Sequence, residues 1–377
     1  MRFGLHYEPG VRPLKSDTVI SRPMSILLDG VRCLSALVVL IVHCVSLQLY
    51  TGYFPFSMSI SHYAVIVFFV LSGLVIANSI RTNDATLSGY TIARFARIAP
   101  VTFVGLLVTF SAGLYANVTG TDLVAVSPAS VDIPLTLMFF GSGATYPLLA
   151  LNPPFWSLIF ELWYYALFGV AIFVRGRRRW LWLLFLALLA GWKVLLLLPV
   201  WLFGVALAFR SGEWQVDLKT APIAFVSGAS LILFAITVEQ AAAYALNTML
   251  GLETFDLSFS QFALSDLAAG IGVVLIFISL APVAEFAAGA IEKWQRPIRS
   301  LAGISFTLYI VHWPLLVLLK MHGVAAGKSP LLFVLLLGGV IGICAVIASQ
   351  TERRSPALRA WLLRKFTSHA RLELAKA

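Results

Sequence analysis

The sequence predicts an all-α polytopic membrane protein with about ten transmembrane helices and both termini in the cytoplasm. Hydrophobic residues make up 60% of the 377 positions and charged residues only 12%, against about 25% charged residues in soluble domains. Apolar runs of the about 17–25 residues that cross a bilayer recur along nearly the whole chain. Lysine and arginine lie almost entirely on one side of these runs, which is how positive charge is distributed across a membrane.

The apolar runs define ten expected spans. They lie near 26–48, 61–80, 97–117, 154–174, 179–193, 194–210, 221–239, 265–284, 302–320 and 329–350. The first run is too long for a signal peptide and lacks a cleavage site, so we expect it to be retained. The run 179–210 is compatible with one hairpin or with one long kinked element. Gly338, Gly339 and Gly342 in the last span predict close helix packing.

These spans divide the chain into a basic cytoplasmic tail at 1–25, a membrane domain at 26–350 and a second basic cytoplasmic tail at 351–377. With this orientation only Lys193, Lys320 and Lys328 face outward, and Arg32 lies within a span. Topology therefore explains the net charge of +10, and we expect the lipid bilayer, not nucleic acid, as a partner. The three cysteines offer neither a disulfide framework nor the spacing of a metal site.

Two loops on the expected outer side, 118–153 and 240–264, are long and carry no lysine or arginine. This composition is compatible with topology alone. It is equally compatible with an outward-facing site for a polar, hydroxylated molecule, which these loops help to shape.

Ionisable side chains inside the spans cost about 2.5–3.5 kcal/mol each on insertion scales, so each one needs a reason. In "DGVRCLSALVVLIVHC", Arg32 and His43 are eleven residues apart. A helix brings them onto one face about 16 Å apart, with Arg32 nearer the cytoplasm. The structural alternatives are a snorkelling arginine and a histidine bonded to a neighbouring carbonyl. Asp29 either pairs with Arg32 or caps the helix start.

In "PPFWSLIFELWYYALF", Ser157, Glu161 and Tyr165 follow one another at intervals of four, on one helix face. Glu161 has no cation near it in sequence, and a buried carboxylate must be paired or protonated. We therefore expect a cationic or imidazole partner from another span. The alternative is an interhelical hydrogen bond without a catalytic role.

In "ISFTLYIVHWPLL", Ser305, Tyr309 and His312 lie at spacings of four and three, with His312 about half-way across the membrane. Pro314 frees a backbone carbonyl and kinks the helix. The alternative is a kinked helix with an aromatic and polar seam.

On the inner side, "RFARIAP" places Arg94 and Arg97 one turn apart. Arginines at this spacing can hold phosphates bidentately. Contact with lipid headgroups is the alternative.

Taken together, these motifs resemble the integral-membrane acyltransferase-3 family, the polysaccharide O-acyltransferases. The resemblance covers roughly 26–350 and rests on five stretches in the family's order: "LLDGVRCLSALVVLIVHC", "FFVLSGLVI", "RFARIAP", "WSLIFELWYY" and "ISFTLYIVHWP". It implies ten helices and transfer of an acyl group, usually acetyl, from cytoplasmic acyl-coenzyme A. The acceptor it implies is a hydroxyl, commonly on a glycan at a bacterial surface, which places the chain in the bacterial inner membrane.

Carried over by position, the resemblance makes His43 the best catalytic candidate and matches Glu161 and His312 to the family's later acid and histidine. It matches Arg32 to the family's arginine in the first helix and assigns Arg94 and Arg97 to the phosphates of coenzyme A. We expect Arg32 to hold these phosphates as well. In three places the chain departs from the family. Only Glu161 stands where many relatives have two adjacent acids. "AVI" at 64–66 replaces a frequent Gly-Val-Asp, so an acid is missing, and Cys33 replaces a frequent glycine.

The residue types suit acyl transfer, which needs a base for the hydroxyl and stabilisation of the oxyanion. We expect His43 to act as general base or as transient acyl carrier, oriented by Glu161 or His312. Trp156, Ser157, Tyr165 and Tyr309 are expected to contact the substrate. We expect acyl-CoA as co-substrate, with no permanent cofactor and no metal.

Two alternatives remain open. One is an acyltransferase for a small molecule, such as a macrolide or a lipid-linked oligosaccharide. The other is a proton-coupled transporter, since intramembrane His, Glu and Arg also form proton relays. Against the transporter, the sequence shows neither an inverted repeat nor a matching pair of broken helices.

Overall fold

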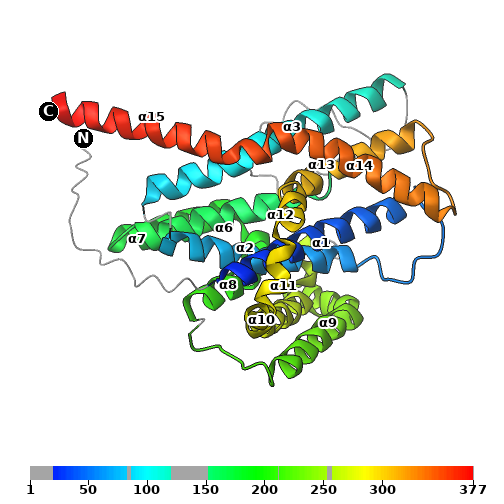
Figure 1. Cartoon of the computed structure of the whole chain (residues 1–377), viewed down its shortest axis with the longest axis horizontal. Coiled ribbons are helices and arrows are strands. Elements are labelled where there is room, and N and C mark those ends of the chain that lie inside the picture. The colour runs from blue at the N-terminus through cyan, green and yellow to red at the C-terminus, as the bar shows by residue number, and fades with distance from the viewer. Residues whose placement is uncertain (1–19, 83–85, 120–151, 211, 253–256, 377) are drawn as a thin grey trace.

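The computed structural model describes residues 20–82, 86–119, 152–210, 212–252 and 257–376, where every long element is a helix (Figure 1). The α-helices are α1 (Arg22–Ser46), α2 (Ile60–Thr82), α3 (Leu87–Thr119), α6 (Phe155–Phe173), α7 (Arg177–Ala190), α8 (Trp192–Arg210), α9 (Ala221–Leu250), α10 (Ala263–Phe286), α11 (Ala288–Lys293), α12 (Gln295–Ala302), α13 (Ser305–Met321), α14 (Pro330–Gln350) and α15 (Ser355–Lys376). Two short 3₁₀ helices are η1 (Ser258–Phe262) and η2 (Glu352–Arg354). The predicted all-α fold is confirmed.

A helix occupies each of the ten predicted spans, but the helices differ in length. Among the described residues, 8 helices are each long and apolar enough to cross a membrane, and α12 with α13, bent by 45°, forms a further candidate. The remaining helix, α7, has 14 residues, or about 21 Å, which is short of the about 30 Å hydrocarbon layer. The cytoplasmic location of both termini depends on α7 crossing, and it stays a prediction.

The run 179–210 consists of two helices, α7 and α8, separated by Gly191 alone. Gly191 has a φ of +81°, a conformation that glycine adopts without steric cost. The sequence between Arg177 and Arg210 therefore divides into two helices at Gly191, as either predicted arrangement requires.

Helix α1 lies within the bundle, in contact with α2, α10, α12 and α13 (Figure 1). Its start is capped by Ser21, whose side chain accepts a hydrogen bond from the Met24 amide, and Pro23 occupies the first turn. Asp29 lies further along the helix and forms an ion pair with Arg32 at 3.0 Å. Of the two roles expected for Asp29, pairing is the one observed.

Close helix packing at glycine occurs between α2 and α8, not along α14. A β-carbon added to Gly73 would lie 2.1 Å from the Trp201 carbonyl oxygen, and one added to Gly204 would lie 1.9 Å from that of Val70. Around Gly338, Gly339 and Gly342 nothing lies within 4 Å of such an atom. The packing role predicted for the last span was therefore wrong, because that side of α14 faces away from its neighbours.

One expected outer loop is largely helical. Helix α9 continues to Leu250, eleven residues past the predicted end of its span. The segment "QAAAYALNTML" is rich in helix-forming Ala and Leu, and Gly251, in the left-handed conformation, ends it. Most of the other expected loop, 118–153, lies outside the described residues.

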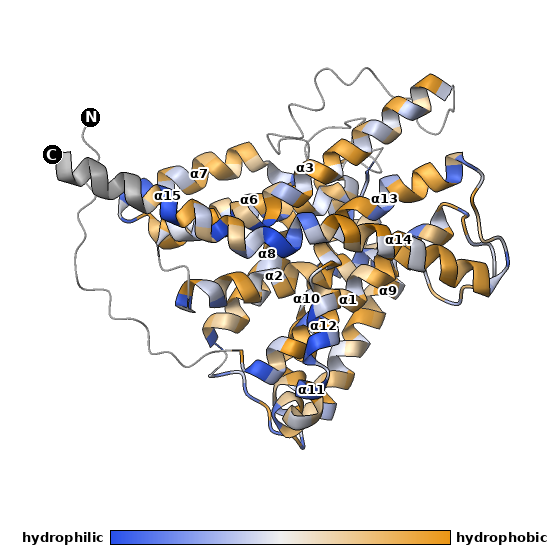
Figure 2. Ribbon diagram, turned by 45° about the horizontal axis from the view of Figure 1, so that its top comes forward, coloured by the Kyte–Doolittle hydropathy of each residue, from blue (hydrophilic) through white to orange (hydrophobic). Residues whose placement is uncertain are grey.

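The outer faces of the helices are apolar, and polar residues concentrate at α12, at α15 and in loops (Figure 2). Large exposed side chains include Trp180 and Leu188 on α7 and Leu331 on α14. So much exposed apolar surface is the signature of a face that meets lipid.

Candidate active site

Among the cavities between the described helices, two share a lining residue, Tyr309. The arginine cavity, of about 90 Å³, is bordered by Arg32, Phe68, Phe69, Leu71, Ser72, Val75, Ile76, Arg97, Ser157, Leu158, Glu161, Tyr165, Ser305, Phe306 and Tyr309. The histidine cavity, of about 80 Å³, is bordered by Val39, His43, Ser61, His62, Val65, Pro153, Pro154, Trp156, Phe259 and Tyr309. Pockets that enclose whole small molecules measure about 300–1,000 Å³, so each cavity has room only for the end of a ligand.

The two predicted catalytic histidines are in contact, although 269 positions separate them in sequence. Nδ1 of His43 on α1 lies 2.8 Å from Nε2 of His312 on α13. The rings are nearly parallel, with centroids 5.1 Å apart, and the Trp313 ring meets that of His43 edge-on. Helix packing thus fixes the orientation of the His43 ring.

The backbone determines which ring nitrogens carry protons. Nδ1 of His312 lies 2.8 Å from the Leu308 carbonyl oxygen, which can only accept, so this nitrogen is the donor. In a neutral ring, the form that a buried position favours, Nε2 of His312 is then the acceptor. His43 therefore donates through Nδ1, and its Nε2 keeps a lone pair at the edge of the histidine cavity.

Two hydroxyl groups close the boundary between the cavities. The Tyr309 hydroxyl donates to the Pro154 carbonyl at 3.0 Å, and Ser157 Oγ lies 2.6 Å from the Tyr309 oxygen. Both side chains are buried. The start of α6, where helix dipoles concentrate positive potential, is held here against α13.

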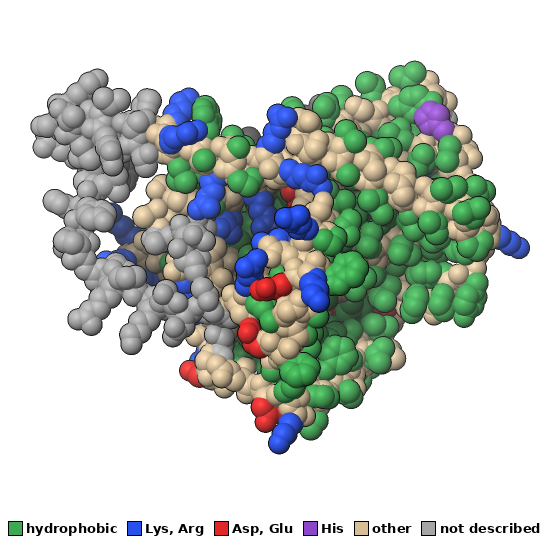
Figure 3. Space-filling model, viewed as in Figure 1, with side chains coloured by type: hydrophobic (Ala, Val, Ile, Leu, Met, Phe, Trp, Pro, Cys, Tyr) green, Lys and Arg blue, Asp and Glu red, His purple; other side chains and the backbone are tan. Residues whose placement is uncertain are grey.

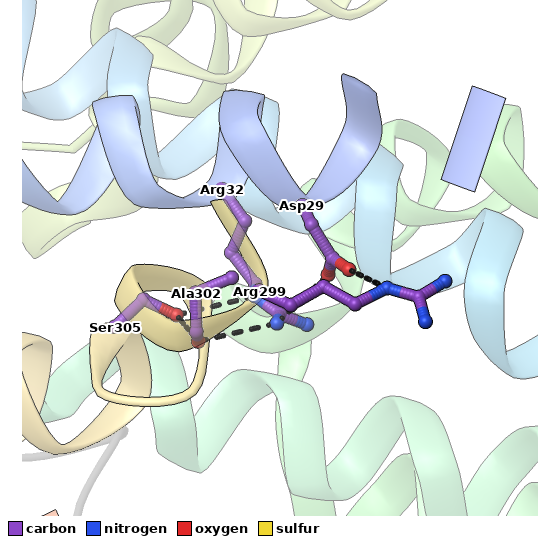
Figure 4. A network of polar contacts seen from close by, with 5 residues as sticks. All are labelled: Asp29, Arg32, Arg299, Ala302 and Ser305. Atoms are coloured by element: carbon purple, nitrogen blue, oxygen red, sulfur yellow. Dashed lines mark hydrogen bonds and ion pairs between the residues drawn. The ribbon is translucent and has the colours of Figure 1, made fainter. Parts of the chain in front are cut away.

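Arg32 extends from α1 to the turn between α12 and α13 (Figure 4). Its Nε donates to Ser305 Oγ at 3.1 Å and its Nη2 to the Ala302 carbonyl at 3.2 Å. Asp29 lies 3.0 Å from Arg32 and 3.9 Å from Arg299. Arg32 is thus an anchored cation at the cavity wall, held by two helices.

The two arginines of α3, Arg94 and Arg97, lie in different environments. Arg97 lines the arginine cavity, and within the described part of the chain no hydrogen bond or ion pair holds its guanidinium. Arg94 donates to Ser79 Oγ at 3.0 Å and lies over the Tyr90 ring at 5.3 Å. It is not among the residues that line the cavity. The structure therefore brings Arg97 together with Arg32 and places Arg94 apart.

Glu161 lies in the arginine cavity, and no hydrogen bond joins it to either imidazole of the pair within the described residues. It accepts a hydrogen bond from the Tyr165 hydroxyl, whose oxygen lies 3.0 Å from Ser72 Oγ. Trp201 Nε1 in turn donates to Ser72. His312, rather than Glu161, is thus the group that orients His43.

Basic side chains gather around a hollow on the face that carries α12 (Figure 3). Arg299 belongs to α12, and Arg353, just after α14, donates to the Ser300 carbonyl. Asp29 connects this face to the arginine cavity, because it contacts both Arg299 and Arg32.

Three ionisable residues near the histidine cavity were missed by the sequence reasoning. His62 Nε2 lies 2.8 Å from Asp266 Oδ1, and Glu239 accepts a hydrogen bond from Ser59. All three occur within or at the end of predicted spans, so the rule that intramembrane ionisable groups need a reason applies to them too. The ring of Trp156, an expected substrate contact, is stacked between those of His62 and Phe259.

Comparison with known proteins identifies the family. The family model Acyl_transf_3, described as an acyltransferase domain, matches residues 26–349. The chain belongs to the acyltransferase-3 family. A search of curated proteins and a search of solved structures gave no match. The match covers both cavities of this acyltransferase and all ten predicted site residues.

Proposed function

We propose that this acyltransferase moves an acyl group, most simply acetyl, from cytoplasmic acyl-CoA to a hydroxyl of a glycan that is extracytoplasmic or lipid-linked. The observation that carries the proposal is the pair of cavities meeting at Tyr309. One is bordered by Arg32 and Arg97, and the other by His43, whose Nδ1 is hydrogen-bonded to His312.

The arginine cavity suits the donor. Coenzyme A carries phosphates, and guanidinium groups bind phosphate oxygens in charge-assisted hydrogen bonds. Arg97 has its donors available, and Arg32 is fixed by α13. Since the cavity of about 90 Å³ is too small for a whole coenzyme, the nucleotide lies at the basic face and the pantetheine arm reaches inward.

The length of α1 matches this arrangement. The helix is continuous from Arg22 to Ser46, so Arg32 and His43 are separated by about 16 Å along its axis. An extended pantetheine arm spans such a distance, which brings the thioester from the arginines to the boundary at Tyr309.

His43 then acts as general base. Its Nε2 lone pair takes the proton of the acceptor hydroxyl while the oxygen attacks the thioester carbon. The His43 imidazolium is stabilised because its Nδ1–H already donates to His312. Collapse of the tetrahedral intermediate breaks the carbon–sulfur bond, and the leaving thiolate takes the proton from His43. The positive end of α6, beside Tyr309, favours the developing oxyanion electrostatically.

The test uses the purified protein in lipid nanodiscs, with labelled acetyl-CoA and membranes of the cells that make it as the acceptor source. His43→Ala is expected to lower transfer by about 10²–10⁴-fold, the range of general base catalysis, while acetyl-CoA binding is retained. Wild-type transfer rates in this variant would contradict the proposal. Mass analysis of surface glycans from cells with and without the protein then identifies the acceptor.

A further inference from the structure

The histidine cavity contains a second imidazole for which the reaction above has no use. His62, at the start of α2, borders the cavity together with His43. Its partner Asp266, in the first turn of α10, is completely buried. Charged groups in such positions are rare unless they pair or take part in function.

The hydrogen bonds define the state of the His62 ring. A carboxylate only accepts, so Nε2 of His62 donates its proton to Asp266 Oδ1 at 2.8 Å. The other carboxylate oxygen, Oδ2, is buried and has no hydrogen-bond partner among the described residues. Among the described residues, His62 is therefore the only hydrogen-bond partner of the Asp266 side chain, and Asp266 orients this ring.

Aromatic contacts fix the ring further. The Trp156 ring lies parallel to it at 6.0 Å, and Phe262 and Tyr63 meet it at steep angles. One turn earlier, Ser59 is tied to Glu239 of α9. The start of α2 is thus anchored to α9 and α10, and the His62 ring is oriented before any ligand arrives.

The remaining nitrogen, Nδ1, is the part of His62 available for a ligand. No hydrogen bond to Nδ1 occurs within the described ranges of the chain, and the ring borders the cavity. In a neutral ring that donates from Nε2 to Asp266, Nδ1 carries a lone pair. A single cavity of about 80 Å³ is hence lined by two imidazole acceptors, each oriented from behind by another side chain.

We propose that His62 is a second substrate-contacting residue, which accepts a hydrogen bond from a hydroxyl of the acceptor next to the one that His43 deprotonates. The acceptor class it selects is a sugar or other polyol with two neighbouring hydroxyls. This inference rests on the proposed function and adds a specificity determinant to it.

Two substitutions separate the ligand contact from the structural one. His62→Gln places an amide at the position of Nε2, so it keeps the bond to Asp266 and loses the group at Nδ1. His62→Asn places an amide at the position of Nδ1 and releases Asp266. His322→Gln is the matched control, because His322 lies at the end of α13 and borders neither cavity.

The measurement is a partition ratio: label incorporated from acetyl-CoA into acceptor in membranes of the producing cells, divided by label released as acetate. Misfolded protein contributes to neither quantity, so the ratio reports on folded enzyme alone. His62→Gln is expected to lower the ratio by about tenfold, the effect of one lost hydrogen bond, with acetyl-CoA binding unchanged. His62→Asn is expected to stay nearer the wild-type ratio, and His322→Gln to equal it.

A ratio within about twofold of wild type in His62→Gln would overturn the inference and leave the proposed function standing. If His62→Gln fails to fold, a tenfold loss in His62→Asn overturns it, and a retained ratio supports it. Absence of acetyl transfer by the wild-type protein would instead refute the proposed function and this inference with it.

Discussion

At the scale of single residues, the proposed catalytic role of His43 depends on a neighbour that holds its proton in place. His312 receives the Nδ1–H of His43 and is itself fixed by the Leu308 carbonyl. A hydrogen bond to a charged group contributes about 1.5–3 kcal/mol, and the His43 imidazolium formed during transfer is such a group. The contact is therefore stronger in the transition state than in the resting enzyme, which is the condition for accelerating the reaction.

We expect His312→Ala to lower the transfer rate by about 10–150-fold, the rate equivalent of that hydrogen bond, with little change in the KM for acetyl-CoA. His312→Gln offers an amide oxygen to His43 and is expected to recover part of the loss. Steady-state kinetics of both variants in nanodiscs checks this. An equal loss in the two variants would show that His312 acts through packing and not through its acceptor nitrogen.

The two arginines of α3 offer a second test at this scale. Arg97 faces the arginine cavity, whereas Arg94 is engaged with Ser79 and Tyr90. Arg97→Ala is expected to weaken coenzyme A binding about tenfold or more, since a charge-assisted hydrogen bond is lost. Arg94→Ala is expected to weaken it by less than about threefold. Calorimetric titration with coenzyme A measures both, and equal weakening would return Arg94 to the binding site.

At the scale of helices, features within one helix could be predicted from the sequence, whereas contacts between helices could not. The face shared by Arg32 and His43 follows from eleven positions of one helix, and α1 is continuous over that interval. The contact between His43 and His312 requires α1 to pack against α13, and no local pattern encodes that pairing. For the same reason, the sequence predicted Glu161 at one site with His43 and His312, although Glu161 lies in the arginine cavity.

Close packing at glycine could not be predicted from the sequence either. Sequence periodicity indicates that a glycine lies in a span, but not whether a neighbouring backbone faces it. Gly73, within the "FFVLSG" stretch, is in close contact with α8, and the three glycines of α14 are not in contact with a neighbour. Only the assembled helices distinguish the two cases.

We expect Gly73→Ala to lower the thermal unfolding midpoint, because the added methyl group would lie 2.1 Å from the Trp201 carbonyl and overpacking costs about 1–3 kcal/mol. Gly338→Ala is the matched control. It meets no atom within 4 Å, and the helix propensity of alanine favours it by about 1 kcal/mol. Tryptophan fluorescence during heating measures both variants, and a lower midpoint for Gly338→Ala alone would contradict the packing observed here.

At the scale of the whole molecule, the proposed function depends on how the protein is oriented in the membrane. Acyl-CoA is a cytoplasmic metabolite, so the arginine cavity has to be reached from the cytoplasm for the proposed transfer to work. The distribution of lysine and arginine predicts that orientation. The short helix α7 is decisive for this orientation. If α7 does not cross the membrane, every later loop lies on the side opposite to the one predicted.

Labelling of single cysteines by a membrane-impermeant maleimide in intact cells tests this orientation. In a background without Cys33, Cys44 and Cys344, Ser57→Cys in the loop before α2 is expected to be labelled from outside. Lys219→Cys, in the loop before α9, is expected to be labelled only after the membrane is permeabilised, because α7 and α8 together return the chain to the inner side. Both positions are exposed, so accessibility within the protein does not limit the reaction.

Labelling of Lys219→Cys in intact cells, with Ser57→Cys also labelled, would mean that α7 does not cross. The C-terminal tail would then lie outside, on the side opposite to the donor.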